Sequence, residues 1–493
     1  MKFPDSCRLA PYDHQFAGTA ALLNKSAFAL FDEMGVGKSK QVVDAVCHAY
    51  VKGVIDTLLV VAPAPARSVW ASPNPLLGEV AKHVWEAMPH TLMEFSSDAP
   101  FRPRDLHGLA VVATNYELVR RPERLATLIA FAEARKTWLV LDESWAVQNH
   151  SAAQTKAIKK LRKVCKRVTL LNGTPGKPEQ LYAQFDIMDP AILGQRNFFT
   201  FRARYCLMGG WQNKKVTGYQ RMDEFRAKTA PYALRRLAKD CLDLPEVLEP
   251  ITIEARLTPQ TWLAYKQMRD ELVLWLSSHE ASVASHAGTR TVRLAQILAG
   301  FVGGVQPMEA DDLFDGPPDA GIRQVGTEKR DALLSFLDGV DPDLKVIVWG
   351  RFRPEMEGYR DALLNQGTHA VHMLWGQQPE AEREATKLAF APGTTVGRAR
   401  MVGHPAAGGA GLNFAAASLN IYATNPWGLK NRQQSEKRID RPGQTRRPQH
   451  VDIVAVGPQG QKTLDHAVLA TLRANGDIAA WTAETWRQVL SEE

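Results

Sequence analysis

Short apolar runs of strand length recur along the chain and alternate with segments in which apolar residues return at helical spacing. The run "SAFALF" at 26–31 is followed by a glycine-rich turn and then by Val42, Val46 and Tyr50 at helical spacing. A second apolar run stands at 138–141. Strands that lack polar alternation are buried on both faces, so the pattern predicts an α/β fold with parallel sheets.

A long helical pattern follows further along, from about residue 258 to residue 310. Its apolar stripe, which is typical of a helix packed in a core, consists of Trp262, Tyr265, Met268, Leu272 and Leu276. The stretch "MEADDLFDGPPDAG", rich in Asp, Pro and Gly, then predicts an exposed connection, and "DLKVIVWGRF" opens another buried strand. Because 493 residues exceed what one core usually serves, we expect two or three domains.

Composition narrows the choice of partners. Lys and Arg total 60 against 53 acidic residues, a net charge of +7, which favours a polyanionic partner. The five cysteines are scattered without metal-ligand spacing, which argues against a disulfide scaffold or a zinc site. The start "MKFPDSCRLA" lacks the apolar run of a signal peptide, and no stretch approaches a membrane span, so we expect a soluble intracellular protein.

The stretch "LFDEMGVGKSKQ" at 30–41 is close to a phosphate-binding loop, although Asp32 stands where such loops have their first glycine. Gly35 and Gly37 would let the backbone approach phosphates at the start of a helix. Lys38 would meet the β- and γ-phosphates of ATP, and Ser39 would ligate Mg²⁺. The alternative is a plain glycine turn before a surface helix.

An acidic pair about a hundred residues later favours the nucleotide site. In "KTWLVLDESWAVQN", Asp142 and Glu143 follow a buried strand, and open α/β sheets bind ligands at the carboxyl ends of their strands. Asp142 can hold Mg²⁺ through water, and Glu143 can polarise the water that attacks the γ-phosphate.

At this point the sequence resembles the SNF2-like family of helicase superfamily 2. That family writes its first motif D-E-M-G-L-G-K-T, from which "DEMGVGKS" departs only at Val36 and Ser39, so Asp32 matches the family's acidic residue. The resemblance covers nearly the whole chain and implies two RecA-like parallel-sheet lobes in tandem with a helical insertion between them. The implied boundaries are 1–235 for the ATP-binding lobe, 236–325 for the insertion and linker, and 326–493 for the second lobe.

Other residues of the first lobe gain roles through the same resemblance. Gln15, in "RLAPYDHQFAG", would read the adenine edge with its amide. Trp70, in "TLLVVAPAPARSVW", and the residues of "LAVVATNYELVRR" would lie near the nucleic acid, and the alternative is that both segments are merely strands of the sheet. The full set of implied nucleic-acid residues is Trp70, Thr114, Asn115, Tyr116, Thr174, Arg235 and Arg236.

Two departures from the family stand near the acidic pair and the third motif. The family usually has His where this chain has Trp145, and Asn where it has Pro178. An indole donates one N–H and cannot accept, unlike an imidazole. We therefore expect the coupling between ATP and DNA to be built differently here.

The stretch "NRQQSEKRIDRPGQTRR" corresponds to the family's last motif. Arg438 and Arg441 are three residues apart, which places them on one face of a helix turn. From there they would reach the γ-phosphate and neutralise charge in the transition state, with Gln434 on the same wall of the cleft. Outside this motif, an R-x-x-R pair is usually a surface pair.

These elements predict an ATP-dependent translocase or remodeller on double-stranded DNA, with ATP and Mg²⁺ as cofactors, no sequence specificity and a protein cargo or partner. A strand-separating DNA or RNA helicase, or a binding scaffold with a silent ATPase, are the alternatives. The basic segment 156–167 would join the DNA track or, as we favour, form an exposed helix face. Compactness favours a bacterial or phage source and the cytoplasm, and a eukaryotic source would imply the nucleus.

Overall fold

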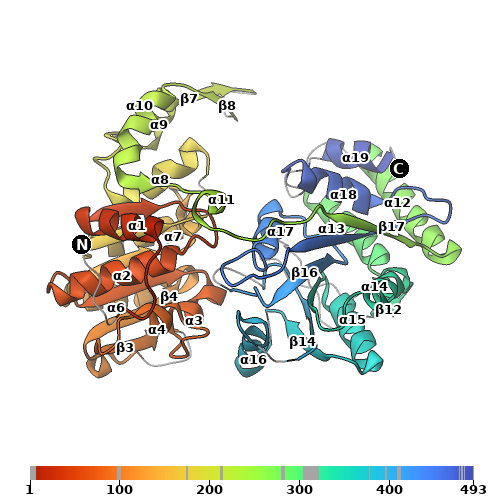
Figure 1. The fold of residues 1–493 in the computed structure, drawn as a ribbon. Coiled ribbons are helices and arrows are strands. Elements are labelled where there is room, and N and C mark those ends of the chain that lie inside the picture. The colour runs from red at the N-terminus through yellow and green to blue at the C-terminus, as the bar shows by residue number, and fades with distance from the viewer. Residues whose placement is uncertain are drawn as a thin grey trace. The chain divides into compact units, whose positions relative to one another are not determined.

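Two separate parallel sheets organise the chain, which divides into Met1–Asp243 and Leu244–Glu493 (Figure 1). The computed structural model describes residues 7–96, 101–173, 176–210, 215–278, 284–303, 321–376, 378–394, 397–407, 412–476, 478, 481 and 483–491. For 275–278, 284–290, 483–484 and 491 it describes the backbone alone. The predicted α/β class with two parallel-sheet lobes is confirmed.

The first unit is built on a seven-stranded sheet in the order β3-β4-β2-β5-β6-β1-β9. Every strand pairing in this sheet is parallel. Its strands are β1 (Ala27–Leu30), β2 (Thr57–Ala62), β3 (His90–Glu94), β4 (Leu109–Asn115), β5 (Thr137–Leu141), β6 (Arg167–Leu171) and β9 (Ala233–Leu234). The central strands β1, β2, β4 and β5 are buried along their whole length, as their unbroken apolar runs predict.

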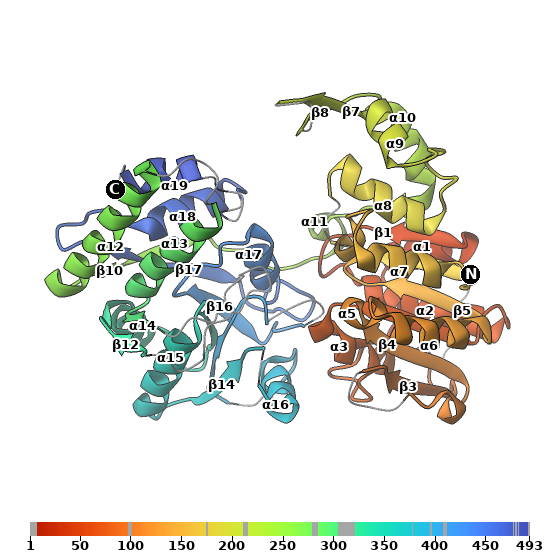
Figure 2. The same cartoon turned by 180° about the vertical axis from the view of Figure 1, so that it is seen from behind.

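Helices cover both faces of this sheet. Alternate strand residues such as Ala29, Val61 and Leu141 pack with α6, α7 and α8 in one apolar cluster. Views from opposite sides show α1 and α2 on one face and α5, α6 and α7 on the other (Figures 1 and 2). The helices are α1 (Asp13–Asn24), α2 (Lys38–Val51), α3 (Arg67–Ala71), α4 (Glu79–His83), α5 (Tyr116–Val119), α6 (Pro122–Glu133), α7 (Ala153–Arg162), α8 (Pro178–Met188), α9 (Phe198–Tyr205), α10 (Met222–Thr229) and α11 (Ala238–Cys241).

Single-turn helices and one hairpin complete the unit. The hairpin of β7 (Cys206–Gly209) and β8 (Lys215–Tyr219) is antiparallel and lies beyond α9 and α10, away from the sheet (Figure 2). The 3-10 turns are η1 (Ala64–Ala66), η2 (Pro103–Asp105), η3 (Ser144–Val147) and η5 (Ala230–Tyr232).

The second unit has a six-stranded parallel sheet in the order β10-β17-β16-β13-β15-β14. Its strands are β10 (Ile251–Arg256), β13 (Lys345–Trp349), β14 (Ala370–Leu374), β15 (Ala399–Gly403), β16 (Ala417–Tyr422) and β17 (Gln449–Val456), and β11 (Phe301–Val302) pairs with β12 (Arg323–Gln324). The helices are α12 (Pro259–Ser278), α13 (Ala284–Leu298), α14 (Glu328–Asp338), α15 (Arg353–Gln366), α16 (Glu380–Phe390), α17 (Leu429–Glu436), α18 (Leu464–Arg473) and α19 (Ala483–Ser491).

The described residues of the segment 236–325 are divided between the two units, with 236–243 in the first unit and the rest in the second. The segment supplies the edge strand β10 to the second sheet, and Tyr265 and Leu272 of α12 pack with α13, α18 and α19 in the core of the second unit. Sequence patterning found the helices and missed the strand, because β10 is exposed along one face and lacks an unbroken apolar run. Most of the expected connection at 308–321 lies outside the described residues.

All five cysteines are free. Burial raises the pKa of the Cys47 and Cys165 thiols to about 12, which leaves both as unreactive core residues. Within the part of the chain that the structure describes, no helix combines the length and the apolar character needed to cross a membrane.

Candidate nucleotide site

The phosphate loop joins β1 to α2, and its two glycines have the backbone conformation that the turn requires. Gly35 and Gly37 have φ of 87° and 84°, in the left-handed region that only glycine adopts freely. A Cβ at Gly37 would lie 2.2 Å from Gln15 Nε2. The Lys38 ammonium donates to the main-chain carbonyls of Asp32 and Glu33, at 2.7 and 3.2 Å. The lysine is therefore held directly over the loop.

Asp32 has a structural partner that sequence analysis missed. Its carboxylate is fully buried. It accepts hydrogen bonds from Nε and Nη2 of Arg236 at 3.0 and 2.6 Å, and a third from Gln41 Nε2 at 3.1 Å. Two residues beyond β9, the Arg236 carbonyl accepts a hydrogen bond from Glu33 N at 2.8 Å. Asp32, which stands where other phosphate loops have their first glycine, thus links the loop to Arg236 near the carboxyl end of the first unit.

The two predicted nucleic-acid arginines therefore differ. The Arg236 guanidinium is bound within the loop, and Arg235 is exposed. Arg236 and Asp32 are 204 residues apart, and no local pattern links them. A DNA contact by Arg235 stays a prediction.

Gln15 lies against the phosphate loop from the first turn of α1. Its amide oxygen accepts the Tyr12 N–H at 3.1 Å, and its Nε2 donates to the Val36 carbonyl at 3.4 Å. An amide has two N–H groups and two oxygen lone pairs, so one of each remains for a ligand. Adenine recognition by Gln15 stays a prediction that this geometry permits.

The acidic pair follows β5, and each carboxylate accepts a hydrogen bond from an indole. Trp70 Nε1 donates to Asp142 Oδ2, and Trp145 Nε1 donates to Glu143 Oε2, both at 2.9 Å. Burial and then the neighbouring Glu143 carboxylate raise the pKa of Asp142, while the Trp70 bond and the nearby Lys38 ammonium lower it. The influence of Lys38 on Asp142 brings the loop and the acidic pair into one electrostatic site.

Ser39 and Asp142 form a donor set that fits Mg²⁺ bound together with a nucleotide. The Ser39 hydroxyl makes no hydrogen bond that the described residues supply. Each Asp142 oxygen accepts one bond, from Trp70 or from the Glu143 N–H, and keeps a lone pair. Mg²⁺ is typically held by one or two carboxylates together with phosphates and water, so one carboxylate and one hydroxyl suit an ion that a nucleotide brings with it.

The predicted nucleic-acid residues of the first unit are placed at the carboxyl edge of the sheet, with buried side chains. Trp70 and Tyr116 both bond Asp142, since the Tyr116 hydroxyl donates to its carbonyl at 2.8 Å. Asn115 caps α5 by accepting the Leu118 N–H, and the side chain of Thr114 is fully buried. A DNA contact by these four buried residues stays a prediction.

Other predictions fall on the helices that follow the acidic pair. Thr174 lies outside the described residues. Pro178 is the first residue of α8, where the missing N–H costs nothing. Within the basic segment 156–167, Lys156 and Lys160 of α7 are exposed and Lys159 pairs with Asp186, so the helix face is present and its DNA role stays a prediction.

In the second unit, the two predicted arginines follow a helix instead of lying within one. α17 ends at Glu436, and Arg438 and Arg441 stand in the turns that come after it. Arg438 is buried and donates to the Leu412 carbonyl at 3.1 Å, and Arg441 Nε donates to the Lys437 carbonyl at 2.8 Å. Pro442 disfavours a helical conformation at Arg441, and Gly443 has a left-handed φ of 98°.

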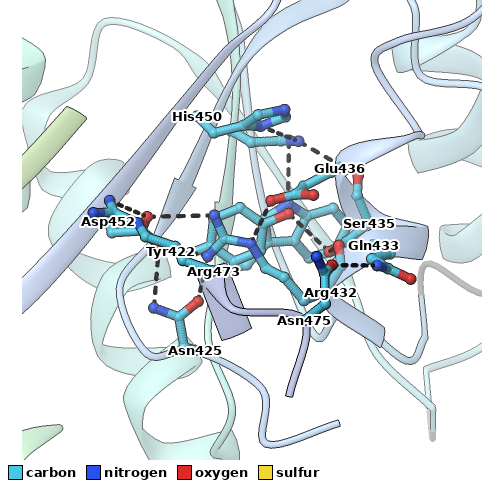
Figure 3. Close-up of polar contacts among 12 residues, drawn as sticks. Tyr422, Asn425, Arg432, Gln433, Ser435, Glu436, His450, Asp452, Arg473 and Asn475 are labelled. Atoms are coloured by element: carbon cyan, nitrogen blue, oxygen red, sulfur yellow. Dashed lines mark hydrogen bonds and ion pairs between the residues drawn. The ribbon is translucent and has the colours of Figure 1, made fainter. Parts of the chain in front are cut away.

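A buried polar network holds α17 on the second sheet (Figure 3). Arg432, on this helix, donates to Asp452 of β17 at 2.5 Å and to Glu436 at 2.7 Å. Its guanidinium also lies 3.5 Å from the centroid of the Tyr422 ring on β16. Gln434, predicted to line the cleft, is buried on the same helix, and its catalytic role stays a prediction.

Comparison with known proteins gives relatives that match most of this chain. An uncharacterized ATP-dependent helicase of Mycoplasma pneumoniae is 24% identical over 88% of this chain and 38% of its own length. The SWI/SNF-related matrix-associated actin-dependent regulator of chromatin subfamily A-like protein 1 of Drosophila melanogaster is 24% identical over 86% of this chain and 50% of its own length. The DNA annealing helicase and endonuclease ZRANB3 of Mus musculus is 23% identical over 97% and 41%. The chain thus spans half or less of these relatives.

Among solved structures, the Sulfolobus solfataricus SWI2/SNF2 ATPase core in complex with dsDNA aligns with 19% identity and a TM-score of 0.42, covering 100% of this chain and 97% of that one. The family described as the SNF2-related domain matches residues 20–304. Because that match takes in more than half of the sequence, the chain belongs to the SNF2-like family of helicase superfamily 2.

Proposed function

We propose that the chain is an ATP-driven translocase or remodeller on double-stranded DNA. The observation that carries the proposal is the convergence, within the first unit, of the Lys38 loop and the Asp142–Glu143 pair at the carboxyl ends of β1 and β5. That edge of a parallel sheet is where such folds bind nucleotides. Membership of the SNF2-like family and relatives named as ATP-dependent helicases support the same activity.

In the proposed reaction, the Lys38 ammonium leaves the Asp32 and Glu33 carbonyls and binds the phosphates of ATP. Ser39 and Asp142 would hold Mg²⁺ together with the nucleotide, and the ion would supply positive charge beside the phosphates. Glu143 orients the attacking water and accepts its proton. Arg438 and Arg441, supplied by the second unit, stabilise the charge that develops on the transferred group.

For the DNA part of the proposal, we expect contacts mainly to phosphates. Such contacts carry no sequence information, so binding to DNA should not depend on its sequence. The logarithm of the binding constant should fall linearly with the logarithm of the salt concentration. The net charge of +7 supports a polyanionic partner. If both units bind one duplex and ATP turnover changes their affinities for DNA in alternation, each cycle advances the protein along the DNA.

The test is steady-state ATP turnover with no nucleic acid, duplex DNA, single-stranded DNA and duplex RNA, with Lys38→Ala as the blank. Stimulation by duplex DNA, together with ATP-dependent displacement of a third strand from a triplex, would support translocation. Preferential stimulation by single strands or RNA, with unwinding of a forked duplex, would establish a strand-separating helicase instead. Nucleic-acid binding without lysine-dependent turnover would leave the scaffold interpretation.

A further inference from the structure

Glu143 has an unusual backbone and a single hydrogen bond to its carboxylate. Its φ of 51° and ψ of 53° are left-handed, a conformation that non-glycine residues hold only where their surroundings enforce it. Its side chain is 8% exposed. Oε2 accepts the Trp145 indole N–H, and no described residue donates to Oε1.

The surroundings that fix this backbone also fix the indole. Trp145 belongs to η3, which closes with a bond from Ala146 N to the Glu143 carbonyl at 3.0 Å. The preceding Ser144 is fully buried and donates to Gln184 of α8 at 2.8 Å. The start of the turn is thus tied to α8, and the indole N–H points at Glu143 Oε2, to which it donates.

An indole is well suited to orienting a base. It donates one hydrogen bond, carries no charge and does not titrate, so it neither takes the proton from the carboxylate nor adds a cation beside it. With Oε2 engaged by this neutral donor, Oε1 is the oxygen left to accept a proton.

We propose that Trp145 is a positioning residue for Glu143, holding Oε2 so that Oε1 faces the attacking water. The proposal rests on the ATPase function proposed above, with Glu143 as the base. It assigns a role to the residue at which this chain departs from the family's usual His. The bland alternative is that the ring of Trp145 merely fills space.

The variants Trp145→Phe and Trp145→His separate the two roles. Phe keeps an aromatic ring and loses the N–H, whereas His keeps a donor on a smaller ring. Removing a general base costs about 10²–10⁴-fold in rate, and a base that is present but loosely held should lose less. We expect kcat of Trp145→Phe to fall about tenfold with unchanged KM for ATP and unchanged Tm, and Trp145→His to recover most of the loss.

Trp138→Phe is the matched control, because the Trp138 indole also donates one hydrogen bond from this sheet, to Thr169 Oγ1 at 3.0 Å. That variant should keep wild-type kcat. Wild-type kcat in Trp145→Phe would overturn the proposal. So would a loss that Trp145→His does not recover, accompanied by a lower Tm, because ring packing would then be the cause.

A second measurement does not depend on turnover. In a ¹⁵N-tryptophan-labelled protein, the indole resonance that disappears in Trp145→Phe should shift in Glu143→Gln, because its acceptor changes from a carboxylate to an amide. An unmoved resonance would overturn the Trp145–Glu143 contact. Absent turnover in the wild type with a shifted resonance would instead overturn the proposed ATPase and the assigned base, while the contact itself would stand.

Discussion

The acidic pair of the first unit and Arg432 of the second unit have hydrogen-bond partners of different kinds. In the first unit, the Asp142 and Glu143 carboxylates accept hydrogen bonds from neutral indoles, each at 2.9 Å. In the second, the Arg432 guanidinium is 6% exposed and is compensated by the fully buried Asp452 carboxylate and by Glu436.

The contrast follows from the roles proposed for the acidic pair and for Arg432. A carboxylate that binds a cation or accepts a proton keeps its reactivity when its partner is neutral, since a salt bridge would satisfy the charge beforehand. A guanidinium that only holds a helix is best fully compensated, because an unpaired buried charge is very costly. Asp32 and Arg236 of the first unit belong to the second kind, since their pairing secures the phosphate loop.

The largest effect is expected for Arg441→Ala. If this residue stabilises the transition state, ATP turnover should fall about 10³-fold or more, while affinity for duplex DNA changes little. Steady-state turnover and fluorescence anisotropy with labelled DNA measure the two quantities. Arg447→Ala is the control, because Arg447 is an exposed arginine paired with Glu246 at 2.8 Å. Weak DNA binding with intact turnover would move Arg441 from catalysis to the DNA surface.

Glu143→Gln tests the carboxylate that is bonded by a neutral indole. We expect turnover to fall by about 10²-fold or more while ATP affinity is retained, because the amide cannot accept the proton but preserves the shape of the side chain. Equilibrium binding of a fluorescent ATP analogue measures the affinity. Glu117→Gln, a change at an exposed carboxylate on α5, is the control. A large drop in affinity would argue that Glu143 binds the nucleotide rather than acting as the base.

Asp452→Asn tests the buried ion pair between Arg432 and Asp452. The change leaves the buried Arg432 charge with Glu436 as its remaining close carboxylate partner, so the second unit should lose about 3 kcal/mol of stability. Urea-dependent hydrogen exchange of β16 and β17 reports that loss. Asp343→Asn removes an exposed partner of Arg398 and should cost about 0.5 kcal/mol or less. Equal stability of the two variants would show that the network contributes little.

The smallest effect concerns His404, which follows β15. Burial and then the nearby Arg351 guanidinium lower the pKa of His404 to about 3. The unfolded chain takes up a proton near pH 6.5 and the folded unit does not, so stability is full above that pH and falls as the pH drops toward 3. The slope for one proton is at most about 1.4 kcal/mol per pH unit.

His404→Gln should therefore flatten the decline in the stability of the second unit between pH 7 and pH 5, as measured by hydrogen exchange of β13 and β15. His107→Gln, at an exposed position in the first unit, should leave that decline unchanged. A decline as steep in His404→Gln as in the wild type would place its cause in other groups.

Local patterns in the sequence were sufficient for the α/β class and for the strand, turn and helix in which we propose the nucleotide site. Gly35, Gly37 and Lys38 are recognisable because a phosphate loop needs left-handed glycines next to a helix start. The position of Asp142 and Glu143 follows from an apolar run that ends in two acids. These features depend on residues close together in the chain, where spacing alone carries the information.

The partners of these residues come from distant parts of the chain and depend on the packing of whole elements. Arg236 reaches Asp32 across 204 residues, and Trp70 reaches Asp142 across 72, so neither contact leaves a trace in local spacing. Similarly, β10 joins the second sheet through backbone pairing that its mixed side-chain pattern does not reveal. Backbone pairing and side-chain contacts are set by which elements lie side by side, and that arrangement exists only in the folded chain.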